Sequence, residues 1–191
     1  MILFRIDILK GPLSFKAEFD VWRDKKLLYK IIEKSSDFFR NILFFTKVRT
    51  VFSLEMEFMD FKTGNRFNIN RGFSFLVPSY KVSLNKSPFI SFYPRKIKLL
   101  TFFPSFMSYE IRDSYNRVIG FTFFKNPFIF GSQKGEVKDA EENTIATFEW
   151  KNYSLWKGYK NCDVLVSSEN ESWIIISIIS AIIKGLYLQQ R

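Results

Sequence analysis

The sequence predicts a mainly β protein, a closed antiparallel β-barrel or a sandwich, with one buried helix at its C-terminal end. Two observations lead to this prediction. Short apolar segments alternate with polar residues at the period of a strand through most of the chain, with turn residues between them. Residues 173–188 are instead apolar on every face, which is typical of an enclosed helix. A closed barrel accounts for both observations, because its wide lumen must be filled.

Length and composition favour one ordered domain. The 191 residues are expected to form a single domain, residues 1–191, with a substantial core, and a hydrophobic content of 47% excludes a disordered chain. Arg5 and Asp7 interrupt the first apolar residues, so a signal peptide is not expected. Cys162 is the only cysteine, so no disulfide framework and no cysteine-based metal site is expected, and a reducing, cytoplasmic location fits.

Residues 1–34 are predicted to form strands joined by turns. Apolar and charged residues alternate from Phe15 to Val21, which is the pattern of a half-buried strand. The polar turn 23–26 follows, and the apolar pattern resumes from Leu27 to Ile32. Residues 35–45 are compatible either with a short helix capped by Ser35-Ser36-Asp37 or with another strand.

The middle of the chain shows the strand pattern more clearly. Apolar residues alternate with polar ones over 54–58, 67–69 and 73–77, and a turn falls at 62–65. Residues 99–107 are predicted to form an apolar loop or strand. Prolines mark turns or edges in this region and exclude long helices; they are Pro78, Pro88, Pro94 and Pro104.

A strand–turn–strand pattern then recurs. Tyr109–Gly120 and Glu136–Ala146 are two copies, and Met59–Phe67 is a looser third copy. Each copy has Asp at the end of its first strand and Asn within the turn. Because Asp and Asn side chains bond to nearby backbone and tolerate left-handed conformations, these residues are predicted to close tight hairpins rather than to catalyse a reaction.

The final helix is predicted over about residues 171–188. Ser168 and Glu171 have the spacing of a capping box, and acids in the first turn suit the helix dipole. The uninterrupted apolar run Trp173–Ile183 is shorter than the about 20 residues that a membrane-spanning helix needs. A helix inside the barrel is therefore the preferred interpretation, and a short tail anchor is the alternative.

Positive charge is concentrated in the first part of the chain. Residues 1–100 hold 19 Lys and Arg against 9 Asp and Glu, and the stretch 61–109 contains no acid at all. Such a stretch indicates an anionic partner such as phosphate or lipid headgroups, unless acids from other strands neutralise it in the folded protein. The candidate headgroup-binding residues are its eight bases: Lys62, Arg66, Arg71, Lys81, Lys86, Arg95, Lys96 and Lys98.

The hairpins Tyr109–Gly120 and Val137–Ala146, the strand expected at Cys162–Ser167 and the final helix resemble the tubby C-terminal-like superfamily. That group includes tubby-like proteins, phospholipid scramblases and LURP-one-related proteins. The resemblance, clearest over residues 55–190, implies a closed antiparallel β-barrel of about twelve strands around a buried apolar C-terminal helix. It also implies a role at membranes, since tubby-like members bind phosphoinositides through basic residues on the barrel. The chain lacks the acidic calcium-binding segment and the cysteine cluster of scramblases, so scrambling is not expected.

Histidine is absent from the sequence, which removes the usual general base and the Ser-His and Cys-His nucleophiles. The expected function is therefore non-enzymatic binding of anionic membrane surfaces or phospholipid headgroups, peripheral to the membrane and without a cofactor. Phe102, Phe103 and Phe106 are the candidate interfacial residues. Single-stranded nucleic-acid binding through a basic aromatic surface and a protein-interaction scaffold are the alternatives, and the oligomeric state is left open.

Overall fold

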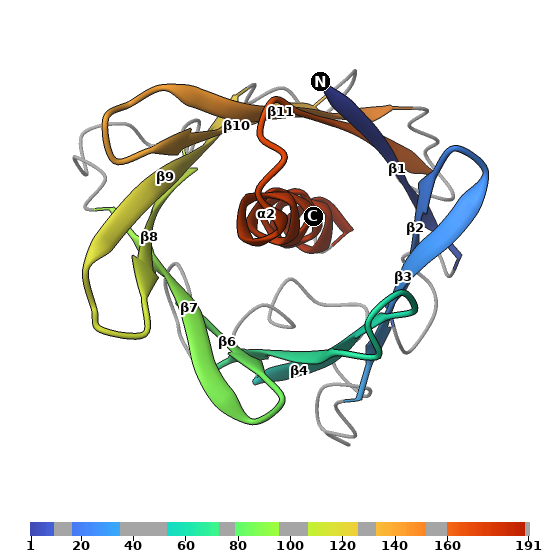
Figure 1. Cartoon of the computed structure of the whole chain (residues 1–191), viewed down its shortest axis with the longest axis horizontal. Helices are drawn as coiled ribbons and strands as arrows, with labels where there is room; N and C mark the ends of the chain where they lie inside the picture. Colours follow the sequence, from blue (N-terminus) through green and yellow to red (C-terminus); the bar gives the residue numbers. More distant parts are fainter. Residues whose placement is uncertain are drawn as a thin grey trace.

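The computed structural model describes residues 1–9, 17–34, 53–72, 79–95, 107–125, 133–151 and 160–189. Within these ranges twelve antiparallel strands close into a barrel, and one helix lies inside it (Figure 1). The strands follow one another around the barrel in chain order, and pairing of β1 with β12 completes the ring. The predicted fold class is therefore confirmed.

The strands are short, and each pairs with its neighbour in the sequence. Their bounds are β1 (Ile2–Ile8), β2 (Glu18–Arg23), β3 (Lys26–Glu33), β4 (Leu54–Asp60), β5 (Arg66–Arg71), β6 (Tyr80–Leu84), β7 (Ser87–Pro94), β8 (Met107–Asp113), β9 (Val118–Lys125), β10 (Gln133–Asp139), β11 (Thr144–Lys151) and β12 (Asn161–Val166). The helix is α2 (Glu171–Gln189).

Side-chain alternation along the strands separates the lumen from the outer surface. In β4, Leu54, Met56 and Phe58 are buried, whereas Glu55 and Glu57 between them face outward. A strand side chain points to the opposite face at each successive residue, so the apolar set of each strand falls on the lumen side. The inward positions of the described strands together form one continuous core with the helix.

The helix α2 is buried in the lumen, on the side of β10, β11 and β12 (Figure 1). Every residue from Ile174 to Lys184 has an exposed fraction of 8% or less. The hydroxyl groups of Ser177 and Ser180 are satisfied within the helix, because each donates to the carbonyl oxygen four residues earlier, at 2.7 and 2.8 Å. The all-round apolar pattern of this segment is thus explained by enclosure on every side.

One tryptophan joins the helix to the barrel wall. The indole Nε1 of Trp150 in β11 donates a hydrogen bond to the carbonyl oxygen of Ala181, at 3.0 Å. A Cβ atom on Gly185 would lie 2.4 Å from the ring of Trp150, so the close approach of helix and strand requires glycine there.

No helix in the described part of the chain is long and apolar enough to cross a membrane.

The helix begins differently from the prediction. Asn170 is the N-cap residue: its side-chain Oδ1 accepts from the Ser172 amide at 2.9 Å, and its carbonyl accepts from the Ile174 amide at 3.1 Å. Ser168 Oγ instead accepts from the Asn170 amide. The predicted capping box between Ser168 and Glu171 is therefore wrong, because Ser168 lies too far before the first helical residue.

Three sequence predictions fall outside the described residues. They concern the helix or strand over 35–45, the alternating segment 73–77, and most of the apolar segment 99–107. Only Met107, the last residue of that segment, is described, and it begins β8.

Candidate anion-binding surface

The described connections between strands lie at one end of the barrel, which we call the hairpin end. Because consecutive strands are antiparallel, every second connection falls at the same end. These connections are residues 24–25, 61–65, 85–86, 114–117 and 140–143, and residues 167–170 lead from β12 into α2 at the same end.

Two hairpins close with two-residue turns that carry lysine at their tips. Asp24 and Lys25 have φ angles of 49° and 63°, and Asn85 and Lys86 have φ angles of 48° and 73°. Positive φ at both central residues is the geometry of a type I′ turn, whose twist matches that of the flanking strands. Lys25 and Lys86 are consequently exposed at the tips.

The β4–β5 connection is organised by Asp60. Its Oδ1 accepts from the amide of Lys62 at 2.8 Å, and its Oδ2 accepts from the hydroxyl of Thr63 at 2.6 Å. Asp60 is 2% exposed, so its charge is turned into the loop and away from the outer surface. Lys62 remains exposed at the tip.

The equivalent aspartates of the two later hairpins have the same role. Asp113 Oδ1 accepts from the Arg117 amide at 2.9 Å, and Asp139 Oδ1 accepts from the Asn143 amide at 2.8 Å. The prediction that these carboxylates close hairpins is confirmed. The pKa of Asp113 is lowered: burial raises it, but the hydrogen bonds from Arg117 and from the Tyr115 amide outweigh that effect.

Hydrogen bonds hold three neighbouring hairpins side by side, namely β2–β3, β4–β5 and β6–β7 (the blue, teal and green hairpins of Figure 1). The amide of Phe61 donates to the carbonyl of Leu28 at 2.9 Å, which ties the β4–β5 turn to β3. The side chain of Asn85 donates to that of Asn65 at 3.1 Å, and its amide donates to the carbonyl of Arg66 at 2.9 Å. The three tips therefore form one continuous arc.

The exposed bases of this arc form what we call the basic rim. Two acids pair with it: Asp24 lies 3.4 Å from Arg23, and Glu57 lies 3.4 Å from Arg66. No ion pair engages the other four bases anywhere in the described part of the chain. The members of the rim are Arg23, Lys25, Lys26, Lys62, Arg66 and Lys86.

Two exposed aromatic side chains lie at the same end of the barrel, one within the rim and one on the next hairpin. Phe61, next to Lys62 in the β4–β5 turn, is 51% exposed. Tyr115, at the tip of the β8–β9 hairpin, is 80% exposed, and the guanidinium of Arg117 lies 5.2 Å from its ring centre. An exposed ring beside a base suits a surface that is apolar at depth and anionic above.

Three of the eight bases predicted from the sequence come together on this rim: Lys62, Arg66 and Lys86. Acids from other strands neutralise the acid-free stretch only in part, since Glu57 of β4 pairs with Arg66 and also with Lys34, at 2.8 Å. Neutralisation by acids of other strands, which was the alternative interpretation of the charge pattern, therefore applies to one of these three bases, Arg66.

The remaining candidates lie elsewhere. Arg71 points into the lumen, is 2% exposed and bonds to the hydroxyl of Tyr80, so it is not part of the outer surface. Lys81 is exposed on the outer face of β6. Arg95 is exposed, and its guanidinium lies 4.4 Å from the centre of the Phe121 ring. The other candidates are outside the described residues: Lys96, Lys98, Phe102, Phe103 and Phe106.

Sequence reasoning missed half of the rim. Arg23, Lys25 and Lys26 belong to a turn that was recognised as polar, but they precede the acid-free stretch by more than 30 residues. Pairing of β3 with β4, seen in the register of Tyr29 with Asp60, brings that turn beside Lys62. A count of charges by hairpin, instead of by stretch of sequence, would have included them.

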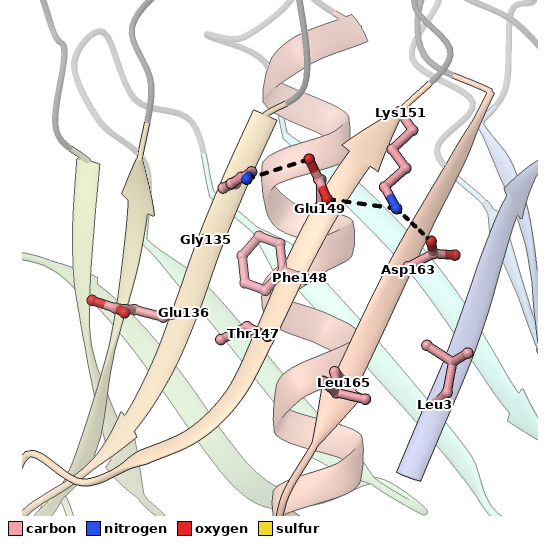
Figure 2. A pocket seen from close by; sticks show the side chains of 10 residues that line it. Leu3, Gly135, Glu136, Thr147, Phe148, Glu149, Lys151, Asp163 and Leu165 are labelled. Carbon is pink, nitrogen blue, oxygen red and sulfur yellow. Dashed lines mark hydrogen bonds and ion pairs between the residues drawn. The ribbon is translucent and has the colours of Figure 1, made fainter. Parts of the chain in front are cut away.

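A groove of about 400 Å³ crosses the outer face of β1, β10, β11 and β12, with α2 behind these strands (Figure 2). Its charges alternate and pair: Lys134 lies 3.7 Å from Glu149, and Lys151 lies 3.5 Å from Glu149 and 2.9 Å from Asp163. The hydrogen bond to Asp163 raises the pKa of Lys151. Because each base here faces an acid, this side of the barrel lacks the positive excess of the rim.

Cys162 is buried, and burial raises the pKa of its thiol well above the ordinary value. The thiol is therefore held protonated within the core. Among the described residues, no three Cys, Asp or Glu side chains are grouped as a metal ion would require.

Comparisons of the chain with protein-family models, with curated proteins and with solved structures found no match. The fold itself therefore defines the class: a closed barrel of twelve antiparallel strands with a C-terminal helix in its lumen, within the described residues.

Proposed function

We propose that this protein binds anionic phospholipid surfaces, and that the basic rim is where the headgroups bind. The observation that carries the proposal is the arc of three hydrogen-bonded hairpins with six exposed bases, four of which have no ion pair in the described chain. Each base near an anionic membrane contributes about 1 kcal/mol of attraction, so four unpaired bases on one arc together strengthen binding to such a membrane.

The exposed ring of Phe61 gives the rim a second means of attachment. It lies among the bases, at the same end of the barrel as Tyr115, so both rings can enter the interfacial layer while the bases contact phosphates. This arrangement favours a lipid surface over single-stranded nucleic acid, because two rings on separate hairpins do not form a continuous stacking platform.

The tubby C-terminal-like superfamily is the family that we propose for this chain. The closed barrel and its central C-terminal helix are consistent with that fold, and the two aspartate-closed hairpins add to the resemblance. We propose that the protein acts at the cytoplasmic side of a membrane and binds lipid without catalysing a reaction.

Sedimentation with vesicles tests the proposal. Vesicles of phosphatidylcholine alone are compared with vesicles that also contain phosphatidylserine, at several salt concentrations. The protein is expected to sediment with the anionic vesicles only, and less at higher salt, because surface charges are screened. Equal sedimentation with both vesicle types, or with neither, would overturn the proposal, as would binding to an RNA oligonucleotide without binding to vesicles.

Charge reversal locates the surface. In the test variant Lys25, Lys26 and Lys86 are changed to Glu; in the control variant Lys81, Lys134 and Lys160, all exposed and away from the rim, are changed to Glu. The two variants have the same net charge. Loss of three attractions of about 1 kcal/mol each predicts that rim reversal weakens vesicle binding at least roughly 100-fold, and more than the control does. Equal weakening would show that only net charge matters.

A further inference from the structure

The hairpin end holds a cavity of about 580 Å³, beside the first turn of α2. This volume lies within the range of about 300–1,000 Å³ that is usual for small-molecule sites. The residues that line it come from β1, β2, β3, the β4–β5 turn and the start of α2. Two sets of charged side chains line the cavity, and its apolar part combines the core residues Phe4 and Ile174 with less buried ones such as Met1.

The two charged sets have opposite sign and come from different parts of the fold. Arg23 and Lys62 belong to the basic rim, whereas Glu169 and Glu171 belong to the start of the helix. No ion pair within 4 Å joins either acid to either base, and Lys62, Glu169 and Glu171 have no ion pair at all within the described chain. The cavity is thus lined by two bases and two acids that do not pair with one another, and we call these two sets its positive and negative walls.

The other side chains that line the cavity are apolar, with one phenol. Phe4 and Ile174 are 1% and 8% exposed, and they close the cavity toward the lumen. Tyr29 also lines it and is 6% exposed. Burial, together with the charges of Asp60 and Glu171, raises the pKa of Tyr29 to about 12, so its hydroxyl stays protonated and able to donate a hydrogen bond.

We infer that this cavity binds a small zwitterion, an aminoalkyl phosphate, with its ammonium group between Glu169 and Glu171 and its phosphate between Arg23 and Lys62. A single anion would face two acids, and a single cation would face two bases, so neither fits both walls. A molecule that carries both charges satisfies both, and a short alkyl or glycerol portion contacts the apolar lining. The same group exists as a soluble phosphodiester and as the headgroup of phosphatidylethanolamine.

Calorimetry with soluble probes tests the inference without a membrane. Glycerophosphoethanolamine is titrated into the whole protein, and ethanolamine and inorganic phosphate are titrated separately. The zwitterion is expected to bind at least about tenfold more tightly than either half, because each half leaves one charged wall of the cavity without a partner. Binding of phosphate as tight as that of the zwitterion, or no binding of the zwitterion, overturns the inference.

Two sets of variants separate this site from the membrane surface. Glu169→Gln with Glu171→Gln is expected to weaken zwitterion binding about tenfold and to leave binding to phosphatidylserine vesicles intact. The rim variant with Lys25, Lys26 and Lys86 changed to Glu is expected to do the reverse, because none of these lysines lines the cavity. If the Gln variants bind the zwitterion as the wild type does, the inference fails, whatever the vesicles show.

A last comparison identifies the source of the ligand. Neutral vesicles of phosphatidylcholine are compared with neutral vesicles that contain phosphatidylethanolamine. Sedimentation with the latter that depends on Glu169 and Glu171 assigns the cavity to a lipid headgroup. Binding of glycerophosphoethanolamine without such sedimentation assigns it to a soluble phosphodiester. If neither occurs, no zwitterion site exists.

Discussion

Gly185→Ala sets two physical effects against each other. Alanine is better than glycine in a helix interior by about 0.8–1 kcal/mol, so propensity alone predicts a more stable protein. The structure predicts the opposite: an added Cβ would lie 2.4, 2.9 and 3.0 Å from three ring carbons of Trp150, well inside the contact distance of about 3.5 Å. The ring is fully buried and hydrogen-bonded to Ala181, so it cannot move aside.

Overpacking of this kind costs typically about 1–3 kcal/mol, and the severity of the overlap places Gly185→Ala at the upper end of that range. After subtraction of the gain in helix propensity, the free energy of unfolding is expected to fall by about 2 kcal/mol. In a protein of this length that corresponds to a melting temperature lower by about 4–8 °C. Thermal and urea unfolding followed by circular dichroism measure both quantities.

Trp150→Phe provides the matched background. The smaller ring leaves room for the Cβ, so Gly185→Ala is expected to cost little in that background, and the double-mutant cycle should show a coupling of about 1–3 kcal/mol. An increase in stability for Gly185→Ala in the wild-type background would refute the proposed contact. The same loss in both backgrounds would place the strain somewhere other than at Trp150.

Ile179→Asp, at a fully buried position near the middle of α2, is expected to prevent folding, because it would place a charge among the apolar side chains of the core; Val118→Asp, at a position 39% exposed, is the control and should melt cooperatively. A cooperative melt of Ile179→Asp near the wild-type temperature would contradict enclosure of the helix. Asp113→Asn is expected to be less stable than the wild type at neutral pH, because the lowered pKa of Asp113 means that its carboxylate stabilises the fold above the ordinary pKa of 3.8. That difference should shrink in acid unfolding curves as the pH falls below 3.8 through the folded-state pKa, and a constant difference would show that the charge is irrelevant.

Local pattern was sufficient for most of the strands. Leu54, Met56 and Phe58 alternate with glutamates in the sequence and face the lumen in the barrel, because strand geometry sends successive side chains to opposite faces. The aspartates of the later hairpins were also readable, since their hydrogen bonds reach only two to four residues along the chain.

The start of the helix shows where local pattern was insufficient. Ser168 and Glu171 match the spacing of a capping box, yet Asn170 makes the cap. Serine and asparagine can both cap a helix, and which of the two does so depends on where the chain leaves β12 and turns into the lumen. That direction depends on the place of β12 in the closed barrel, between β1 and β11.

The sequence by itself determined that a series of short strands is followed by one apolar helix, because the period of hydrophobic residues is a local property of each segment. It also showed an excess of positive charge early in the chain. Only the tertiary structure decided which bases share a surface. Pairing of β3 with β4 brings Lys25 and Lys26 to the same arc as Lys62, whereas side-chain alternation sends Arg71 into the lumen. Charge acts through space, so its grouping depends on strand register and barrel closure, which no single stretch of sequence contains.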